Sequence, residues 1–91
     1  MIVVTGSVTA REDSFDEILR LSREHVNRSR MEPGCIAHAV HVDCENPLRL
    51  VFFERWMFAV PASRELVRSL QTLAAGPTTL ELFDASKIEK L

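Results

Sequence analysis

The residues best suited to chemistry lie in the stretch 35-CIAHAVHVD-43. His38 and His41 stand three positions apart, so on an extended strand their side chains point to opposite faces and cannot share one metal ion. His38 is either a satisfied core histidine or the base of a pocket. Because imidazole titrates near neutral pH, it suits general acid–base catalysis. His38 is therefore the first candidate catalytic residue.

A second candidate group lies on one face of the expected strand 48-LRLVFFERW-56, which carries Leu50, Phe52, Glu54 and Trp56. Glu54 needs a partner or water, because an isolated buried carboxylate is costly, so its role is either structural pairing or a part in the site. Trp56 offers a rigid ring and one N–H donor. It either packs in the core or forms a wall against a flat aromatic substrate, and Leu50 and Phe52 would extend that wall.

The two cysteines do not indicate a disulfide framework. If both lay on one strand, Cys35 and Cys44 would be about 30 Å apart at ~3.3 Å per residue, which is far beyond bridging distance. Two free thiols are expected, as in a reducing compartment. The sequence contains no GxGxxG, P-loop, CxxC or HExxH motif, so we expect no nucleotide, flavin or metal cofactor.

Length and composition indicate one globular domain covering residues 1–91. A net charge of −2, with 11 basic residues scattered among 13 acidic ones, argues against nucleic-acid binding. No apolar run reaches the ~20 residues that a membrane span requires, and the N-terminus lacks the pattern of a signal peptide. A cytoplasmic protein is therefore expected.

Hydrophobic periodicity predicts four strands and two helices in the order β-α-β-β-α-β. The expected strands are 2–11, 35–43, 48–56 and 78–85, and the first helix is 15–30. A capping box of Ser14 and Glu17 would start that helix, and His25 lies near the edge of its apolar stripe. Pro61 and Ser63 open the second helix. This order predicts an α+β, ferredoxin-like fold with a four-stranded antiparallel sheet.

Two helices can cover only one face of such a sheet. By strict alternation, His38 shares the covered face with Ile36, Val40 and Val42. The other face would be apolar and would meet water; its members are Val3, Ala37, Ala39, Val51, Phe53 and Phe83. A patch of this size usually marks an interface, so we expect a homodimer whose two sheets pack face to face and close toward a barrel.

The elements 32-EPGC-35 and 54-ERW-56, with the hydrophobic strand after the first, resemble the antibiotic biosynthesis monooxygenase domain family, within the dimeric α+β barrel superfamily. The resemblance covers nearly the whole chain. It implies a substrate pocket on the helix side of the sheet. It also implies one of several activities: cofactor-free oxidation of polycyclic anthrones and quinols, haem degradation, or isomerisation of small phosphorylated ketones.

The chain departs from the family pattern after Trp56. The family usually carries an extra segment there, often with a histidine, whereas only Met57–Ala62 separates Trp56 from the second helix, and no histidine follows His41. Haem degradation is disfavoured most, because haem iron needs an axial ligand.

The leading hypothesis is a cofactor-independent monooxygenase that oxidises a small aromatic or polyketide-like phenol or quinol with O2. His38 and Trp56 are the expected catalytic residues. The expected substrate-binding residues are Ile36, Val40, Leu50, Phe52 and Glu54. One alternative is a non-oxidative, isomerase-type enzyme for a small carbonyl compound, whose anion would be held by Arg11, Arg64 or Arg68. The other is a non-catalytic dimer that binds a small molecule or has a closed pocket.

Overall fold

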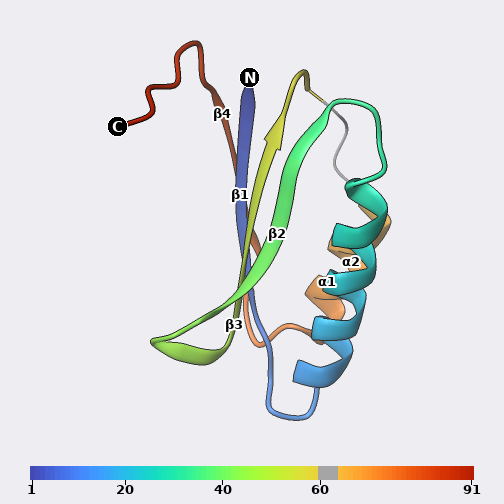
Figure 1. The fold of residues 1–91 in the computed structure, drawn as a ribbon. Coiled ribbons are helices and arrows are strands. Elements are labelled where there is room, and N and C mark those ends of the chain that lie inside the picture. The colour runs from blue at the N-terminus through green and yellow to red at the C-terminus, as the bar shows by residue number, and fades with distance from the viewer. Residues whose placement is uncertain (60–63) are drawn as a thin grey trace.

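The structure is a computed structural model that describes residues 1–59 and 64–91. Its elements, in chain order, are β1 (Ile2–Thr9), α1 (Phe15–Ser29), β2 (Cys35–Asp43), β3 (Asn46–Trp56), α2 (Arg64–Leu73) and β4 (Thr79–Asp84) (Figure 1). The predicted element order is confirmed, although the ends of several elements differ by one or two residues. The predicted opening of the second helix at Pro61 and Ser63 lies outside the described residues.

The four strands form one antiparallel sheet in the order β2-β3-β1-β4, which confirms the ferredoxin-like fold. The strand β1 is central and pairs with β3 on one side and β4 on the other, so Gly6 lies between Phe52 and Leu80. Both helices lie on the same side of this sheet (Figure 1). In the described part of the chain, neither helix is long and apolar enough to cross a membrane.

The core lies between the sheet and the helices. Its most buried large side chains are Val8, Ile18 and Leu50, which come from β1, α1 and β3. The buried stripe of α1 also includes the small residues Ser22 and Ser29. Because serine takes little room, α1 leaves space above the sheet at the level of Ser29.

The start of α1 differs from the predicted capping box. Ser14 is the N-cap residue, but its hydroxyl makes no bond to the first turn of the helix. It donates instead to the carbonyl of Leu73 over 2.6 Å and accepts from the amide of Arg11 over 3.1 Å. Glu17 pairs with Arg20 on the exposed side of the helix. Ser14 therefore links the start of α1 to the end of α2.

The start of strand β2 contains an irregularity that the sequence pattern does not predict. Its register against β3 shifts between Cys35 and Ala37, so Cys35 lies opposite Trp56 and Ile36 is an extra residue in the ladder. The strict alternation predicted for this strand is therefore wrong at its start. Ile36 is 43% exposed, whereas His38 is buried. The expected alternation holds from His38, which pairs with Glu54, to Val42, but a second register shift follows between Val42 and Asp43. Val42, predicted on the covered face, is 50% exposed.

The turn between α1 and β2 requires a glycine, Gly34. Gly34 has a φ of +88°, a left-handed conformation that only glycine adopts at little cost. Its carbonyl accepts from the amide of Met57, and the ring of Phe58 lies against its Cα. A Cβ at this position would lie 2.6 Å from the nearest ring carbon. Both the backbone conformation and the packing therefore require glycine.

Candidate functional site

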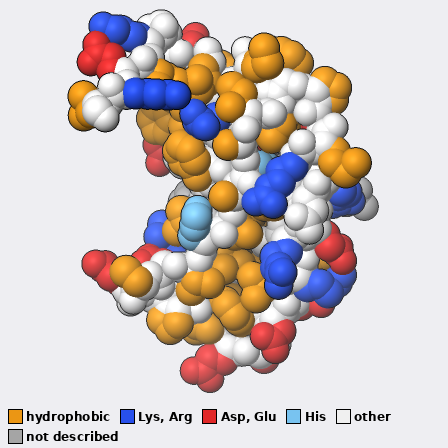
Figure 2. All heavy atoms as spheres, in the orientation of Figure 1, with side chains coloured by type: hydrophobic (Ala, Val, Ile, Leu, Met, Phe, Trp, Pro, Cys, Tyr) orange, Lys and Arg blue, Asp and Glu red, His pale blue; other side chains and the backbone are white. Residues whose placement is uncertain are grey.

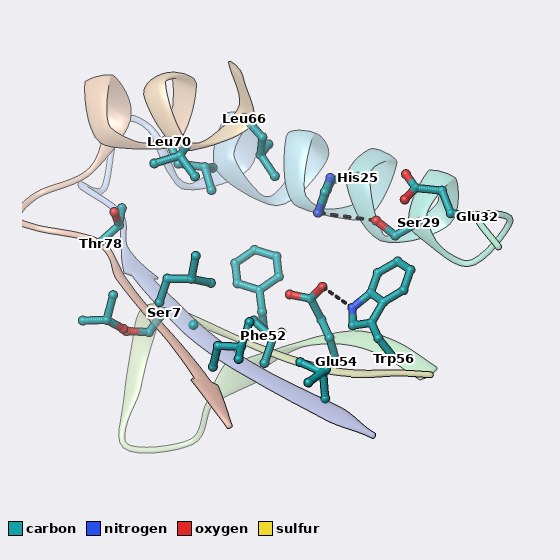
Figure 3. A pocket seen from close by; sticks show the side chains of 17 residues that line it. Ser7, His25, Ser29, Glu32, Phe52, Glu54, Trp56, Leu66, Leu70 and Thr78 are labelled. Atoms are coloured by element: carbon teal, nitrogen blue, oxygen red, sulfur yellow. Dashed lines mark hydrogen bonds between the residues drawn. The ribbon is translucent and has the colours of Figure 1, made fainter. Parts of the chain in front are cut away.

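A cavity of about 290 Å³ lies between the sheet and the two helices (Figure 3). Its middle is apolar: Phe52 of β3 rises from the floor, and Leu66 and Leu70 of α2 form the roof. Val4 of β1 and Leu82 of β4 also line it, and more than half of Leu82 is exposed. The cavity is therefore open to solvent beside β4.

Polar side chains gather at one end of this cavity. Glu54 and Trp56 project from the sheet, and His25, Ser29 and Glu32 face them from α1 and the turn after it (Figure 3). Among the lining residues whose side chains the structure describes, the charged ones are both carboxylates. This end of the cavity is thus suited to ligand groups that donate hydrogen bonds and carry no negative charge.

Glu54 is the most chemically distinctive lining residue. Its side chain is 14% exposed, and one carboxylate oxygen, Oε1, accepts from Trp56 Nε1 over 3.0 Å. Burial raises the pKa of Glu54, the hydrogen bond from Trp56 opposes that rise, and the charge of Glu32 adds to it. The net effect is a carboxylate that binds a proton more readily than an ordinary glutamate.

His38 lies behind Glu54 and Trp56 and is not one of the residues that line the cavity. The ring is fully buried, with Nδ1 3.6 Å from Oε1 of Glu54. The rings of His25 and Trp56 meet it edge-on, at centroid distances of 5.1 Å and 6.4 Å. Burial, aided by the charges of His25 and Arg30, lowers the pKa of His38 to about 4. His38 is therefore neutral near pH 7, and it does not line the cavity.

His25 lines the cavity, although the sequence marks it only as a residue near the edge of the apolar stripe of α1. Its ring lies 3.5 Å from the hydroxyl of Ser29 (Figure 3). Burial lowers the pKa of His25; the charge of Arg28 adds to this and that of Glu32 opposes it. Its spacing of seven residues from Ile18, on the apolar stripe of α1, is the sequence signal that could have placed His25 inward.

The other predicted site residues divide into those that line the cavity and those that do not. Phe52, Glu54 and Trp56 line it together, as their shared face predicts. Leu50 is 1% exposed and belongs to the core. Val40 packs against that core and borders a separate hollow under α1, and the exposed Ile36 does not line the cavity. The contributions of β1 and β4 to the lining were not predicted, because they depend on tertiary packing.

The arginines proposed for an anionic substrate are not in the described lining. Arg11 bonds to Asp13 and to the carbonyl of Ala74 on the surface. Arg68 is exposed and does not line the cavity, and the side chain of Arg64 lies outside the described part of the structure. Among the side chains that the structure describes, no three His, Cys, Asp or Glu residues are grouped so as to hold a metal ion.

Comparisons with known proteins give a family match and a consistent fold. Residues 1–57 match the family described as antibiotic biosynthesis monooxygenase. The uncharacterised protein sll1783 of Synechocystis is 29% identical over 98 residues, covering 99% of this chain and 67% of that protein.

Solved structures resemble the whole fold. One, named a crystal structure of antibiotic biosynthesis monooxygenase, is 28% identical with a TM-score of 0.80, covering 96% of this chain and 100% of the other. A Deinococcus radiodurans protein provisionally given the same name has a TM-score of 0.89 at 18% identity, covering 100% and 98%. Rv0793 of Mycobacterium tuberculosis has a TM-score of 0.82 at 16% identity, covering 98% of each chain. The last two similarities support the fold alone.

Proposed function

The chain belongs to the antibiotic biosynthesis monooxygenase family, and from that premise we propose that it oxidises a small, uncharged aromatic phenol or quinol with molecular oxygen and no cofactor. One observation carries this proposal: Glu54, a carboxylate with a raised pKa, stands in the wall of an apolar cavity. Such a carboxylate is a stronger base than an ordinary one and can take the proton of a phenol held against it.

The size of the cavity limits the substrate. A volume of about 290 Å³ is at the lower end of the ~300–1,000 Å³ typical of ligand sites. Phe52 and Trp56 offer flat apolar surfaces that suit an aromatic ring. A substrate with a single ring, or with two fused rings, fits this space better than a larger polycyclic substrate.

The charge of the lining further limits the substrate. Glu32 and Glu54 stand at the polar end, and a phosphate or carboxylate placed beside them would be repelled. A hydroxyl group, in contrast, can donate to Glu54. This arrangement supports a neutral phenol or quinol over the anionic carbonyl compound of the isomerase-type alternative.

The reaction needs only the substrate, oxygen and a base. Glu54 accepts the phenolic proton, and the electron-rich phenolate passes one electron to O2. The resulting superoxide and phenoxyl radical join at a ring carbon as a peroxide. Loss of water leaves a carbonyl at that carbon, and Glu54 returns its proton to the departing oxygen. For a hydroquinone, the sum is hydroquinone plus O2 giving hydroxyquinone plus water, so the substrate supplies all the electrons.

The assembly proposed for this enzyme is a homodimer through the uncovered face of the sheet. Phe53 and Phe83 are exposed on that face, beside Val51 and Ala39. Figure 2 shows the sheet side of the molecule hollowed between the C-terminal segment and the β2–β3 hairpin. An exposed apolar surface of this kind supports contact with a second copy. Two free cysteines, of which Cys44 is exposed, support a reducing, cytoplasmic location.

Oxygen uptake by the purified protein tests the proposed reaction. The substrates are one- and two-ring hydroquinones, each measured with a chelator present and corrected for spontaneous oxidation. Glu54→Gln removes the base and should lower kcat/KM by at least about 100-fold. The matched control is Glu45→Gln in the exposed β2–β3 turn, which should leave the rate unchanged.

A charged analogue tests the substrate class. A sulfonated hydroquinone should react with kcat/KM at least about tenfold lower than its neutral parent, because the two carboxylates repel it. Uptake no faster than the spontaneous rate for every substrate would refute the oxygenase assignment. Uptake that Glu54→Gln leaves intact would refute the role of Glu54.

A further inference from the structure

His38 is a buried titratable side chain to which the proposed reaction gives no role. Its ring is fully buried, and neither ring nitrogen has a hydrogen-bond partner among the described residues. Buried polar atoms are nearly always paired, because an unpaired one loses its bonds to water and gains none. An exception beside a candidate catalytic base therefore calls for an explanation.

The geometry around Glu54 supplies one. Nδ1 of His38 lies 3.6 Å from Oε1 of Glu54, and that same oxygen already accepts from Trp56 Nε1. The two residues are direct partners across β2 and β3, so their side chains leave the sheet on the same face. A shift of the carboxylate by roughly 0.7 Å would bring Nδ1 within ordinary hydrogen-bond distance.

We propose that His38 is a positioning residue for Glu54: its Nδ1–H donates to Oε1 when the carboxylate is ionised. Oε1 would then be held by two N–H groups, those of His38 and Trp56, and Oε2 would be left to face the cavity and receive the proton. This inference rests on the proposed function, because it assigns His38 a role in the action of that base.

The surroundings of His38 favour a neutral donor over a second base. His25 faces its ring from α1, and Glu54 and Trp56 face it from β3. Arg30, after α1, donates to the backbone carbonyl of His38 over 2.9 Å. Burial and the charges of His25 and Arg30 lower the pKa of His38, so the ring keeps one N–H and no charge near pH 7. The ring also does not line the cavity, so it does not contact substrate directly.

A pair of amide substitutions separates this role from simple packing. The side-chain amide of asparagine reaches the position of Nδ1, whereas that of glutamine reaches the position of Nε2. His38→Asn should therefore keep the donor to Glu54, while His38→Gln and His38→Leu should lose it. The direct measurement is the pKa of the Glu54 carboxyl in the ligand-free protein, followed by NMR of carbon-13 at its side chain.

The loss of an N–H donor to a carboxylate should raise the pKa of Glu54 by about one unit in His38→Gln and His38→Leu. In His38→Asn the pKa should stay near the wild-type value. An unchanged pKa of Glu54 in His38→Gln would overturn the proposal. So would an equal rise in His38→Asn and His38→Gln, because packing alone would then explain both.

The same variants report on catalysis when oxygen uptake is present. The acid limb of the pH profile of kcat/KM should move upward by about one pH unit in His38→Gln and stay in place in His38→Asn. The two proposals fail separately. Absence of oxygen uptake refutes the oxygenase, whereas the titration of Glu54 still decides whether His38 positions that carboxylate.

Discussion

Replacing His38 with asparagine should remove much of the protein's sensitivity to acid. In the folded protein, burial and the charges of His25 and Arg30 lower the pKa of His38 to about 4. In the unfolded chain the imidazole titrates near its ordinary value of about 6.5. Between these values the unfolded chain binds a proton that the folded protein does not. The stability due to neutral His38 is therefore complete above pH 6.5 and is lost as the pH falls toward 4.

The two pKa values of His38 set the size of this effect. The free energy of unfolding should fall by about 2 kcal/mol at pH 5 and about 3 kcal/mol at pH 4, through His38 alone. A small domain has only about 5–15 kcal/mol of stability, so the loss is a large share. Glu54, with its raised pKa, acts in the opposite direction, and His25 acts in the same direction as His38. Both remain in the His38→Asn variant, so the comparison isolates His38.

Urea unfolding measures the effect, with fluorescence of Trp56, the single tryptophan, as the signal. Protein concentration is held constant across the pH range, because association would change the apparent stability. Gln71→Asn is the control, since Gln71 is exposed on α2 and the change adds or removes no titratable group, so the wild-type pH dependence should be retained. Equal losses of stability in wild type and His38→Asn between about pH 7 and about pH 4.5 would refute the reasoning.

Three further predictions concern packing, the base and the turn before β2. Leu50→Ala should lower the free energy of unfolding by about 2–5 kcal/mol, whereas Ile36→Ala should cost less than about 1 kcal/mol; urea unfolding compares them, and equal costs would contradict their different burial. Trp56→Phe removes the N–H donor to Glu54 and should raise the pKa of that carboxyl by about one unit in an NMR titration; a lowered pKa would show that the hydrogen bond does not favour the charged form. Gly34→Ala should lower the melting temperature by several degrees, because it must adopt a left-handed backbone against an aromatic ring; an unchanged temperature would mean that the turn rearranges freely.

Regular elements made part of the site predictable from sequence. The strand β3 alternates without interruption through Phe52, Glu54 and Trp56, so their common place on the cavity wall followed from the period of two. The element order likewise followed from periodicity, since each segment carries its own pattern of apolar residues.

The other parts of the fold and of the site could not be predicted, because they depend on features that the local sequence pattern does not encode. Ile36 left its expected place because an extra residue shifts the register at the start of β2. His38 lies on the predicted face of the sheet. It does not line the cavity, because α1 packs over it and the cavity lies toward β1 and β4. Ser14 bonds to Leu73, far away in sequence, instead of completing a local cap. Such long-range contacts decide between alternatives that are equally good locally.

The position of β4 in the sheet has a consequence for how this protein behaves at high concentration. It is an edge strand, and all six of its residues are exposed, including Leu80, Leu82 and Phe83. An open, apolar edge can pair with the same edge of another molecule and begin aggregation. The charges of Lys87 and Glu89 follow it closely and would discourage such growth. Truncation of the chain after Ala85 would remove this protection and favour aggregation through β4.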